Sequence, residues 1–418
     1  MPNRSDQIVI LGYEAVAPLG TLWPDQWRRA LKGESGIGPL TRFTVDEDFP
    51  VKVAGQVPDF DPSPYPFLSA RAMAHWHSPI FKHALLVVHR ALVRSGIEIT
   101  PELAPRVATT FSSAVGGQDA VLAADRLMIA RGKSPHPFTN PNACINMVGG
   151  KASILTGATG PILSTITACA TGVTSLIIGA MLIKQGQADV AICGAVDFAL
   201  VEPIVAGFFT MNGAYNPKVG QEGEPPQRAS RPFSVDRRGF VISEGAAATI
   251  IARKTFADGY GHPYQAELAG WAMTSDAHHF VAPHLPTVSR CISQSLESAG
   301  IRPDQIDAVN AHAASTRAGD LVEYQALRGI FGQKLPPITA NKSLIGHAMG
   351  ASSAIETVMA LEGMARDMLP PTINHTPDPQ LPVDCVAEGA RQVDQRYVLK
   401  NSFGFGGCNA CIVLRKAL

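Results

Sequence analysis

The feature that most constrains the fold is a nearly all-apolar segment, residues 171–185 (TGVTSLIIGAMLIKQ), between two strand-like runs. Its length and composition are typical of a helix without a polar face, so we expect it to be buried. Residues 161–168 (PILSTITA) precede it, and residues 189–193 (DVAIC) follow it. Both runs are short and rich in β-branched and small apolar residues, which predicts a strand on each side of the buried helix.

Strand-like and helix-like segments alternate in the same way along the rest of the chain, which indicates layered α/β architecture. Further strands are expected at residues 7–11 and 306–310 and in a run ending at Thr339, and helices at residues 289–300, 320–331 and 352–366. Both halves contain a helix, a buried strand, a glycine-rich turn and another helix, a weak sign of internal repetition. The polar, glycine-containing stretch 254–263 predicts a boundary near residues 253–265.

The composition allows a large core and shows no bias toward nucleic acids. Of the 418 residues, 46% are hydrophobic and 17% are charged, and 35 basic residues balance 35 acidic ones. A neutral chain gives no general reason to expect nucleic acid or an anionic membrane as a partner. No apolar run is long enough for a transmembrane helix, and the N-terminus lacks the apolar core of a signal peptide.

The seven cysteines are scattered along the chain. None forms a CxxC pair, and none joins histidines at the spacing of a zinc site. This pattern predicts free thiols in a reducing compartment, and hence a cytoplasmic protein without a metal site.

Cys169 lies in residues 167–172 (TACATG), where a predicted strand meets the predicted apolar helix. A sharp turn of small residues there would place its sulfur at the helix N-terminus, where the dipole and free N–H groups favour a thiolate and lower the thiol pKa. The same N–H groups can form an oxyanion hole. A buried structural thiol is the competing interpretation, because free cysteine is common in protein cores. At this point both interpretations stay open.

Two histidines lie in turns that are rich in small residues. His312 follows the predicted strand 306–310, and His347 precedes the predicted helix 352–366. The carboxyl end of a strand is where α/β folds place catalytic groups. Each histidine alone is more often an ordinary core or surface residue. Two histidines that converge on a cysteine, however, form an arrangement that nucleophilic catalysis uses.

Two glycine-containing stretches complete the pattern. Residues 401–407 (NSFGFGG) lack the lysine of a P-loop and lie too close to the C-terminus for a nucleotide-binding unit. A close turn beneath an active site is therefore the favoured interpretation. The stretch 231–245 contains charged residues beside a turn, and we expect it to form a structural ion-pair network.

Together these five stretches, in this order, resemble the elongating β-ketoacyl-acyl-carrier-protein synthases, which are thiolase-like condensing enzymes. The resemblance runs almost end to end, from strand 7–11 and its following Pro-Leu-Gly turn to the glycine-rich C-terminal loop. It implies an α/β, five-layered α-β-α-β-α fold built from two similar halves. Residues 1–255 would carry the nucleophilic cysteine, and residues 256–418 the two catalytic histidines. The family is usually a homodimer, and a heterodimer stays open.

The resemblance also implies a reaction. Cys169 would receive an acyl chain from the phosphopantetheine of acyl carrier protein, and His312 and His347 would hold the thioester oxygen of a malonyl unit while it loses carbon dioxide. The resulting carbanion would attack the acyl carbonyl, a decarboxylative Claisen condensation that gives β-ketoacyl-acyl-carrier protein in fatty-acid or polyketide biosynthesis. Lys342 and Glu356 correspond to a pair that orients the region of His312. No cofactor is implied, because the thioester is the electron sink.

Substrate-binding positions are implied by the same resemblance. The N–H group of Phe403 would complete an oxyanion hole with that of Cys169, and its ring would be a gate that moves when the acyl chain loads. In the loop expected to bind the pantetheine arm, Thr316 keeps its hydroxyl, but Ala314 stands where a threonine is usual. Ser315 is the candidate to compensate for that loss.

This sequence departs from the pattern at the acyl pocket and at the carrier-binding surface. Val115 and Thr139 correspond to the pocket wall and are smaller than is common, which predicts a longer or bulkier acyl chain. The stretch after Pro64 offers few basic residues for an acidic carrier protein, so we expect a dedicated carrier. The candidate docking residues are Arg71, His75, His77, Arg131 and Lys133.

Two other functions fit parts of the pattern. An acyltransferase on the same fold would move the acyl group from Cys169 to an alcohol or amine, but it would not need two histidines for decarboxylation. A chain-length-setting subunit of a heterodimer would lack the nucleophile.

Overall fold

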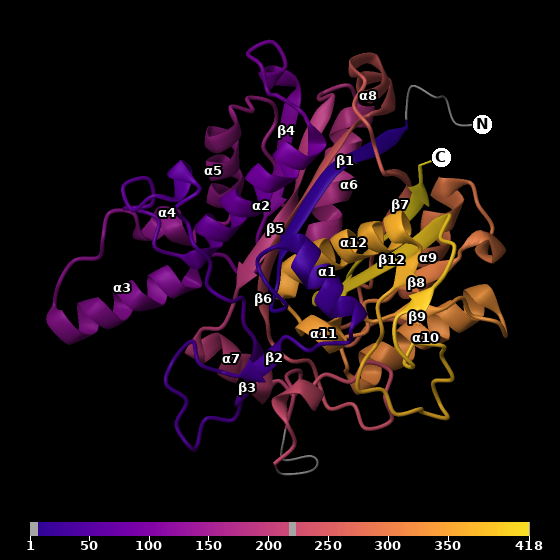
Figure 1. Ribbon diagram of the computed structural model, residues 1–418. Coiled ribbons are helices and arrows are strands. Elements are labelled where there is room, and N and C mark those ends of the chain that lie inside the picture. The colour runs from indigo at the N-terminus through magenta and orange to yellow at the C-terminus, as the bar shows by residue number, and fades with distance from the viewer. Residues whose placement is uncertain (1–6, 217–222, 418) are drawn as a thin grey trace.

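The chain folds into five layers in the order helices, strands, helices, strands, helices (Figure 1). The computed structural model describes residues 7–216 and 223–417. Nine strands are hydrogen-bonded in one mixed sheet, in which the four strands of the first half are followed by the five of the second half. The expected five-layered α/β architecture is therefore confirmed.

The two strand layers meet at one short junction. The first layer has the order β4 (Val107–Ser112), β5 (Val190–Phe198), β6 (Glu244–Arg253), β1 (Ile8–Val16), and the second has the order β7 (Ala266–Ser275), β13 (Cys408–Lys416), β12 (Tyr397–Gly404), β8 (Ala308–Asn310), β9 (Ile338–Thr339). Strand β1 pairs with β7 only from Ile8 to Ile10. The predicted division between residues 255 and 256 falls in α8 (Lys254–Tyr260), between β6 and β7, and it stays a prediction.

The central layer consists of α6 (Thr171–Lys184) and α12 (Met349–Arg366), which pack against each other and against both strand layers. Their contact is close at Gly172, where an added Cβ would lie 2.4 Å from the backbone nitrogen of Ala354. Helices α2 (Pro79–Ser95) and α5 (Asn146–Thr156) cover the first strand layer, and α9 (Leu285–Ala299) and α10 (Arg317–Phe331) cover the second. Both central helices begin at the middle of the molecule, beside the candidate active site.

The segments around the apolar helix bear out two of the three predictions made for them. The helix expected at residues 171–185 is α6, and the strand expected at residues 189–193 is the longer β5. The strand expected at residues 161–168 is wrong, because Ile162 alone makes a bridge there, to Thr109 in the edge strand β4. Its apolar side chains stay on the surface, and Ile166 is 49% exposed. A β-branched run needs a partner strand on both sides to become part of a sheet interior, and β4 offers only one edge.

The remaining elements lie around these layers. They are α1 (Trp23–Leu31), α3 (Gln118–Arg131), α4 (Thr139–Ala143), α7 (Glu202–Thr210), α11 (Lys342–Ile345), β2 (Ile37–Pro39), β3 (Val53–Gly55), β10 (Met368–Leu369) and β11 (Arg391–Gln392). Helix α3 extends away from the body and has no buried residue (Figure 1). Within the described ranges, no helix combines the length and the apolar character that crossing a membrane requires.

Candidate active site

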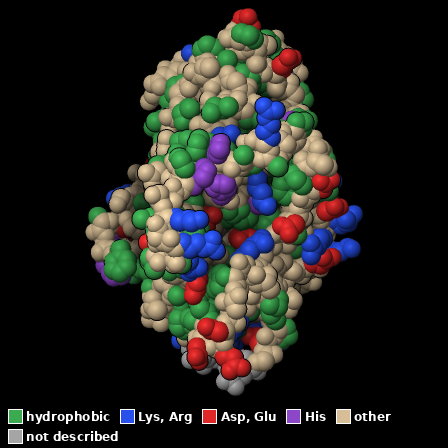
Figure 2. Space-filling view, turned by 90° about the vertical axis from the view of Figure 1, so that its left-hand side faces the viewer, with side chains coloured by type: hydrophobic (Ala, Val, Ile, Leu, Met, Phe, Trp, Pro, Cys, Tyr) green, Lys and Arg blue, Asp and Glu red, His purple; other side chains and the backbone are tan. Residues whose placement is uncertain are grey.

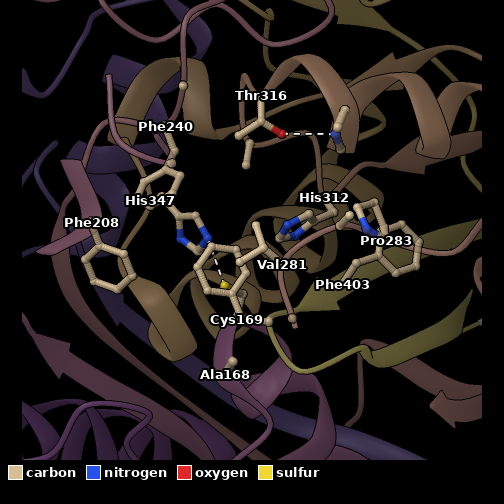
Figure 3. Close-up of a pocket in the computed structure, with 18 of the residues that line it drawn as sticks. Ala168, Cys169, Phe208, Phe240, Val281, Pro283, His312, Thr316, His347 and Phe403 are labelled. Atoms are coloured by element: carbon tan, nitrogen blue, oxygen red, sulfur yellow. Dashed lines mark hydrogen bonds between the residues drawn. The ribbon is translucent and has the colours of Figure 1, made fainter. Parts of the chain in front are cut away.

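A cavity of about 560 Å³, lined by residues of both halves, contains Cys169, His312 and His347 (Figure 3). Most of its wall is apolar. Phe208 and Phe240 lie on the side of His347, and the other histidine lies nearer to Phe403. The structure thus brings together the cysteine and the two histidines that the sequence singled out.

Cys169 lies in a single 3₁₀ turn, Ala168–Ala170, immediately before α6. The preceding Ala168 has a φ of 47°, a left-handed conformation that is strained for a residue with a Cβ. This turn places the sulfur in the cavity, where the Cys169 Sγ lies 3.1 Å from His347 Nε2. The predicted position of the thiol at the start of the apolar helix is therefore confirmed.

The expected low pKa of this thiol is wrong. Burial raises the pKa of Cys169 to about 11, and the positive charge of Lys342 opposes that shift only in part. The helix N-terminus favours the thiolate, but a thiol that is 7% exposed has lost the water that would stabilise its charge. At neutral pH the resting thiol is therefore protonated, and it needs a proton acceptor such as the neighbouring His347.

The second backbone donor near the sulfur belongs to Phe405, because its N–H group faces Cys169 Sγ. The assignment of this donor to Phe403 is wrong. Phe403 is paired with Asn409 in the β12–β13 ladder, whereas residue 405 lies in the turn beyond the strand. The Phe403 ring lines the cavity, with its centroid 5.8 Å from that of His312.

Hydrogen bonds hold the His347 ring and the backbone of both histidines. His347 Nδ1 contacts Ser352 Oγ at 2.9 Å, and the backbone N–H of His347 donates to the backbone oxygen of Val241 at 2.7 Å. The backbone N–H of His312 donates to Glu323 Oε1 at 2.9 Å. The two imidazole centroids are 5.8 Å apart with the rings edge to face, so one small group that lies beside both rings can contact both.

Both imidazoles are neutral at physiological pH. Burial, followed by the charge of Lys342, lowers the pKa of His312 and of His347 well below the usual 6.5. A neutral imidazole offers one N–H donor and one acceptor nitrogen. The serine hydroxyl at His347 Nδ1 can donate or accept, so it can support either tautomer of that ring.

A buried ion cluster stands behind His312. Lys342 Nζ donates to the backbone oxygen of His312 at 2.6 Å and to Glu356 Oε1 at 2.6 Å. The other carboxylate oxygen, Glu356 Oε2, accepts from Lys400 Nζ at 2.7 Å. The predicted pair of Lys342 and Glu356 does lie together. Lys400 was not among the predicted site residues, although a lysine directly after the apolar strand residues Tyr397–Leu399 was an available signal.

A second buried carboxylate, Asp197 at the end of β5, was also missed. It accepts from Ser113 Oγ at 2.6 Å, from the N–H of Val115 at 2.9 Å and from the N–H of Ala351 at 3.2 Å. Burial, opposed in part by these donors, raises the pKa of Asp197 to about 6. Asp197 thereby joins a segment of the cavity wall to the first turn of α12. A charged residue at the end of a buried strand was the sequence signal.

The predicted substrate-binding residues divide into two groups. Val115, Thr316 and Phe403 line the cavity. Thr316 also caps α10, because its Oγ accepts from the N–H of Gly319. Ser315 does not reach the cavity: it is fully buried, and its Oγ accepts from the N–H of Arg231. Thr139 begins α4, outside the cavity lining of this chain.

The charged stretch 231–245 forms ion pairs, as predicted. Arg231 pairs with Asp236, Arg237 with Asp378 at 2.8 Å, and Arg42 with Glu244 at 2.7 Å.

Known proteins with the same architecture bear on this site. Residues 5–257 match the family described as Beta-ketoacyl synthase, N-terminal domain, and residues 265–376 match its C-terminal domain. The 3-oxoacyl-[acyl-carrier-protein] synthase 2 of Coxiella burnetii is 34% identical over 98% of each chain. A solved beta-ketoacyl synthase from Burkholderia phymatum is 28% identical, with a TM-score of 0.90 over 99% of this chain and 100% of that one. A ketosynthase of a type II polyketide system, solved with its acyl-carrier protein and a bound hexaketide, is 26% identical, with a TM-score of 0.89 and the same coverage.

Proposed function

Because this chain belongs to the β-ketoacyl synthase family, we propose that it condenses a malonyl unit on acyl carrier protein with an acyl chain held on Cys169. The product is a β-ketoacyl-acyl-carrier protein of fatty-acid or polyketide biosynthesis. The observation that carries the proposal is the convergence of one thiol and two neutral imidazoles in one apolar cavity. A simple acyl transfer uses the thiol and one base, whereas decarboxylation also needs donors for a developing enolate.

The first step loads the acyl chain. His347 Nε2 takes the proton of the Cys169 thiol, and the sulfur attacks the thioester carbonyl of the acyl-carrier protein. The N–H groups of Cys169 and Phe405 stabilise the resulting oxyanion. The pantetheine thiolate then leaves and takes up the proton from His347, so no net proton is consumed.

The second step generates the nucleophile. The bond between the malonyl methylene carbon and its carboxylate breaks, and its electron pair enters the thioester as an enolate. The enolate oxygen accepts hydrogen bonds from the N–H groups of His312 and His347, whose neutral state makes the donors available without a buried positive charge. For this step His347 carries its single proton on Nε2 rather than on Nδ1, a change of tautomer that the Ser352 hydroxyl at Nδ1 allows. The cations of Lys342 and Lys400 add a favourable field for the developing negative charge.

The third step forms the carbon–carbon bond. The enolate carbon attacks the acyl carbonyl on Cys169, and the same two backbone N–H groups stabilise the oxyanion. When this intermediate collapses, the carbon–sulfur bond breaks and the β-ketoacyl chain remains on the carrier. The released thiolate takes up one proton from solvent. The thioester is the electron sink throughout, so the proposed chemistry calls on no metal or organic cofactor.

The test measures carbon dioxide and the β-ketoacyl product from acyl- and malonyl-loaded carrier protein. The wild type should form both, and His312→Ala should lower condensation by about 10²–10³-fold, the usual effect of removing one such donor. Loading of Cys169 should persist in that variant. The matched control is His262→Ala, a histidine at the end of α8 outside the cavity lining. Condensation by His312→Ala at the wild-type rate would refute the decarboxylation step.

The acyl chain would occupy the cavity arm beside Val115 and Phe208, which are both among its lining residues. The small Val115 side chain leaves that arm open, which supports the expectation of a long or bulky chain.

The carrier would be a dedicated one. Two of the residues on this chain that are candidates for docking the carrier lie in a cluster of rings. His75 stacks on Phe138 with 4.5 Å between ring centroids, and both His75 and His77 contact His136.

Two chains would associate as a homodimer along the edge of β4. Segment 161–166 follows that edge through the bonds Thr109 N–H to Pro161 O and Leu163 N–H to Thr109 O. It exposes Ile162 and Leu163 by 43% and 42%. The face that carries α3 and α4 shows hydrophobic side chains at the surface between Lys, Arg and His (Figure 2). An open strand edge with exposed apolar residues favours pairing with another chain. A monomer mass by light scattering would contradict this assignment.

The compartment would be the cytoplasm. All seven cysteines are free thiols in the structure, including Cys291 and Cys411, whose side chains contact each other. Free thiols at this density are typical of a reducing compartment.

A further inference from the structure

Lys400 is a fully buried cation in the middle of β12. Its Nζ donates to Glu356 Oε2 at 2.7 Å and to the backbone oxygen of Asn401 at 2.6 Å. The parallel ladder of β12 and β8 pairs Lys400 with Asn310, which lies two residues before His312. Burying an ammonium group is costly unless anions and acceptors surround it, and both kinds of partner are present here.

Both lysines of the buried cluster lie on one path that begins at the backbone oxygen of His312. Lys342 Nζ donates to that oxygen and to Glu356 Oε1, each at 2.6 Å. The other carboxylate oxygen, Glu356 Oε2, accepts from Lys400 Nζ, which also donates to the backbone oxygen of Asn401. The path thus runs from the His312 carbonyl through two cations and one shared anion to β12.

A second path returns from β12 to the same residue. Asn401 Nδ2 donates to Glu323 Oε1 at 3.0 Å, and this oxygen also accepts the backbone N–H of His312 at 2.9 Å. The other oxygen, Glu323 Oε2, accepts the N–H of Ala313 at 2.7 Å. The two paths close a hydrogen-bond circuit that holds His312 by its carbonyl oxygen and by its N–H group. Lys400 is the link that joins the first path to β12.

The charges of this circuit balance only when Lys400 is part of it. Its two carboxylates, Glu323 and Glu356, face two ammonium groups, Lys342 and Lys400, and all four side chains are 1% exposed or less. Burial and the charge of Lys342 are the larger causes of the low pKa of both catalytic histidines, and the charge of Lys400 adds to them. Without Lys400 the circuit would be open and would carry a net negative charge behind the imidazoles.

Strand β12 also contacts the turn that carries the thiol, because Ser402 Oγ donates to the backbone oxygen of Cys169 at 3.2 Å. We propose that Lys400 is a positioning residue for condensation, because it closes the circuit that fixes His312 against the strand that supports Cys169. This inference rests on the proposed function, in which His312 donates to the enolate oxygen. Lys400 itself lies outside the cavity lining and acts through Glu356 and the backbone of β12.

The test follows loading and condensation separately in two variants that open the circuit. Lys400→Met removes the ammonium and keeps most of the side-chain length, whereas Asn401→Ala breaks the bond to Glu323 without changing the charge. The matched control is Lys416→Met, at the end of β13, whose ammonium pairs with Asp367 at 2.6 Å outside the cavity lining. Each protein is first loaded with the acyl-carrier protein that acylates the wild type. Malonyl-carrier protein is then added over a range of concentrations and pH values.

Both variants should lower kcat for condensation by about 10–10²-fold, because His312 is no longer held from both sides, while loading and the KM for malonyl-carrier protein change less than about threefold. In Lys400→Met the acid limb of the kcat profile should move to higher pH, because loss of a nearby cation raises the pKa of the histidines. In Asn401→Ala the acid limb should stay in place, and Lys416→Met should resemble the wild type throughout.

A wild-type kcat in either variant would overturn the proposal. A loss of loading as large as the loss of condensation, or an unmoved acid limb in Lys400→Met, would overturn it as well. If Lys400→Met does not fold, the comparison of loading with condensation in Asn401→Ala decides. A wild type that releases no carbon dioxide from malonyl-carrier protein would instead refute the proposed function.

Discussion

Replacing Glu356 by glutamine tests the buried ion cluster behind His312. The carboxylate is fully buried, and it holds Lys342 Nζ at 2.6 Å and Lys400 Nζ at 2.7 Å, two ammonium groups that are themselves 1% exposed or less. At an effective dielectric constant of about 20, a unit pair at this distance attracts by roughly 6 kcal/mol. Desolvation and the repulsion between the lysines offset most of it. Removing the anion leaves both cations unpaired, and such losses typically cost about 3–5 kcal/mol.

Glu356→Gln should therefore lower the free energy of unfolding by about 3–5 kcal/mol, measured by denaturant titration. The variant should also lose condensation activity by about 10²-fold, because Lys342 holds the backbone oxygen of His312 and with it one enolate donor. Loading of Cys169 should fall much less. The matched control is Glu202→Gln, which breaks the exposed pair with Arg126 and should cost less than about 1 kcal/mol.

An unfolding free energy of Glu356→Gln within about 1 kcal/mol of the wild type would refute the energetic role of the cluster. Condensation by the folded variant at the wild-type rate would show that the cluster has no part in holding His312. A variant that loses loading and condensation equally would place the cluster at the acylation step instead.

Burial and packing lead to three more predictions. Because burial raises the pKa of Cys169 to about 11, its alkylation by iodoacetamide should accelerate about tenfold per pH unit between pH 7 and 10; a plateau below pH 8 would contradict the raised pKa. Val115→Phe should shorten the acyl chains found in the products, and an unchanged product profile would count against Val115 as a wall of the acyl arm. Gly172→Ala should destabilise the protein by about 1–3 kcal/mol, since its Cβ would lie 2.4 Å from the Ala354 nitrogen. Gly150→Ala, in α5 with open space around the new Cβ, should be neutral or stabilising in the same denaturant titration.

The sequence predicted the parts of the molecule that depend on local pattern. The apolar helix α6, the strand β5 and the turn that carries Cys169 follow from composition over a few residues, and all three are present. The strand expected at residues 161–168 failed because strand formation depends on an edge elsewhere in the fold. The β-branched residues of this segment remain on the surface beside β4 instead.

Two predictions for the site were wrong, the low pKa of Cys169 and the choice of Phe403 as the second backbone donor. The first failed because of burial, and the second because the donor lies in the turn two residues further along the chain. The pKa of Cys169 depends on what surrounds the sulfur, which a motif does not contain. The backbone N–H beside the sulfur is that of Phe405 rather than Phe403, because β12 extends to Gly404 and keeps the first phenylalanine in the ladder. Lys400 and Asp197 act through partners far away in the sequence, so each was visible only as a charge in an apolar strand.

In the proposed reaction, Cys169 carries the acyl chain while the malonyl unit loses carbon dioxide. The most direct measurement is the mass of the protein after incubation with acyl-carrier protein, followed by peptide mapping. We expect one acyl group, located on Cys169, which disappears with release of carbon dioxide when malonyl-carrier protein is added. An acyl group on another residue, or β-ketoacyl product from Cys169→Ala, would contradict the role of Cys169 as the acyl carrier.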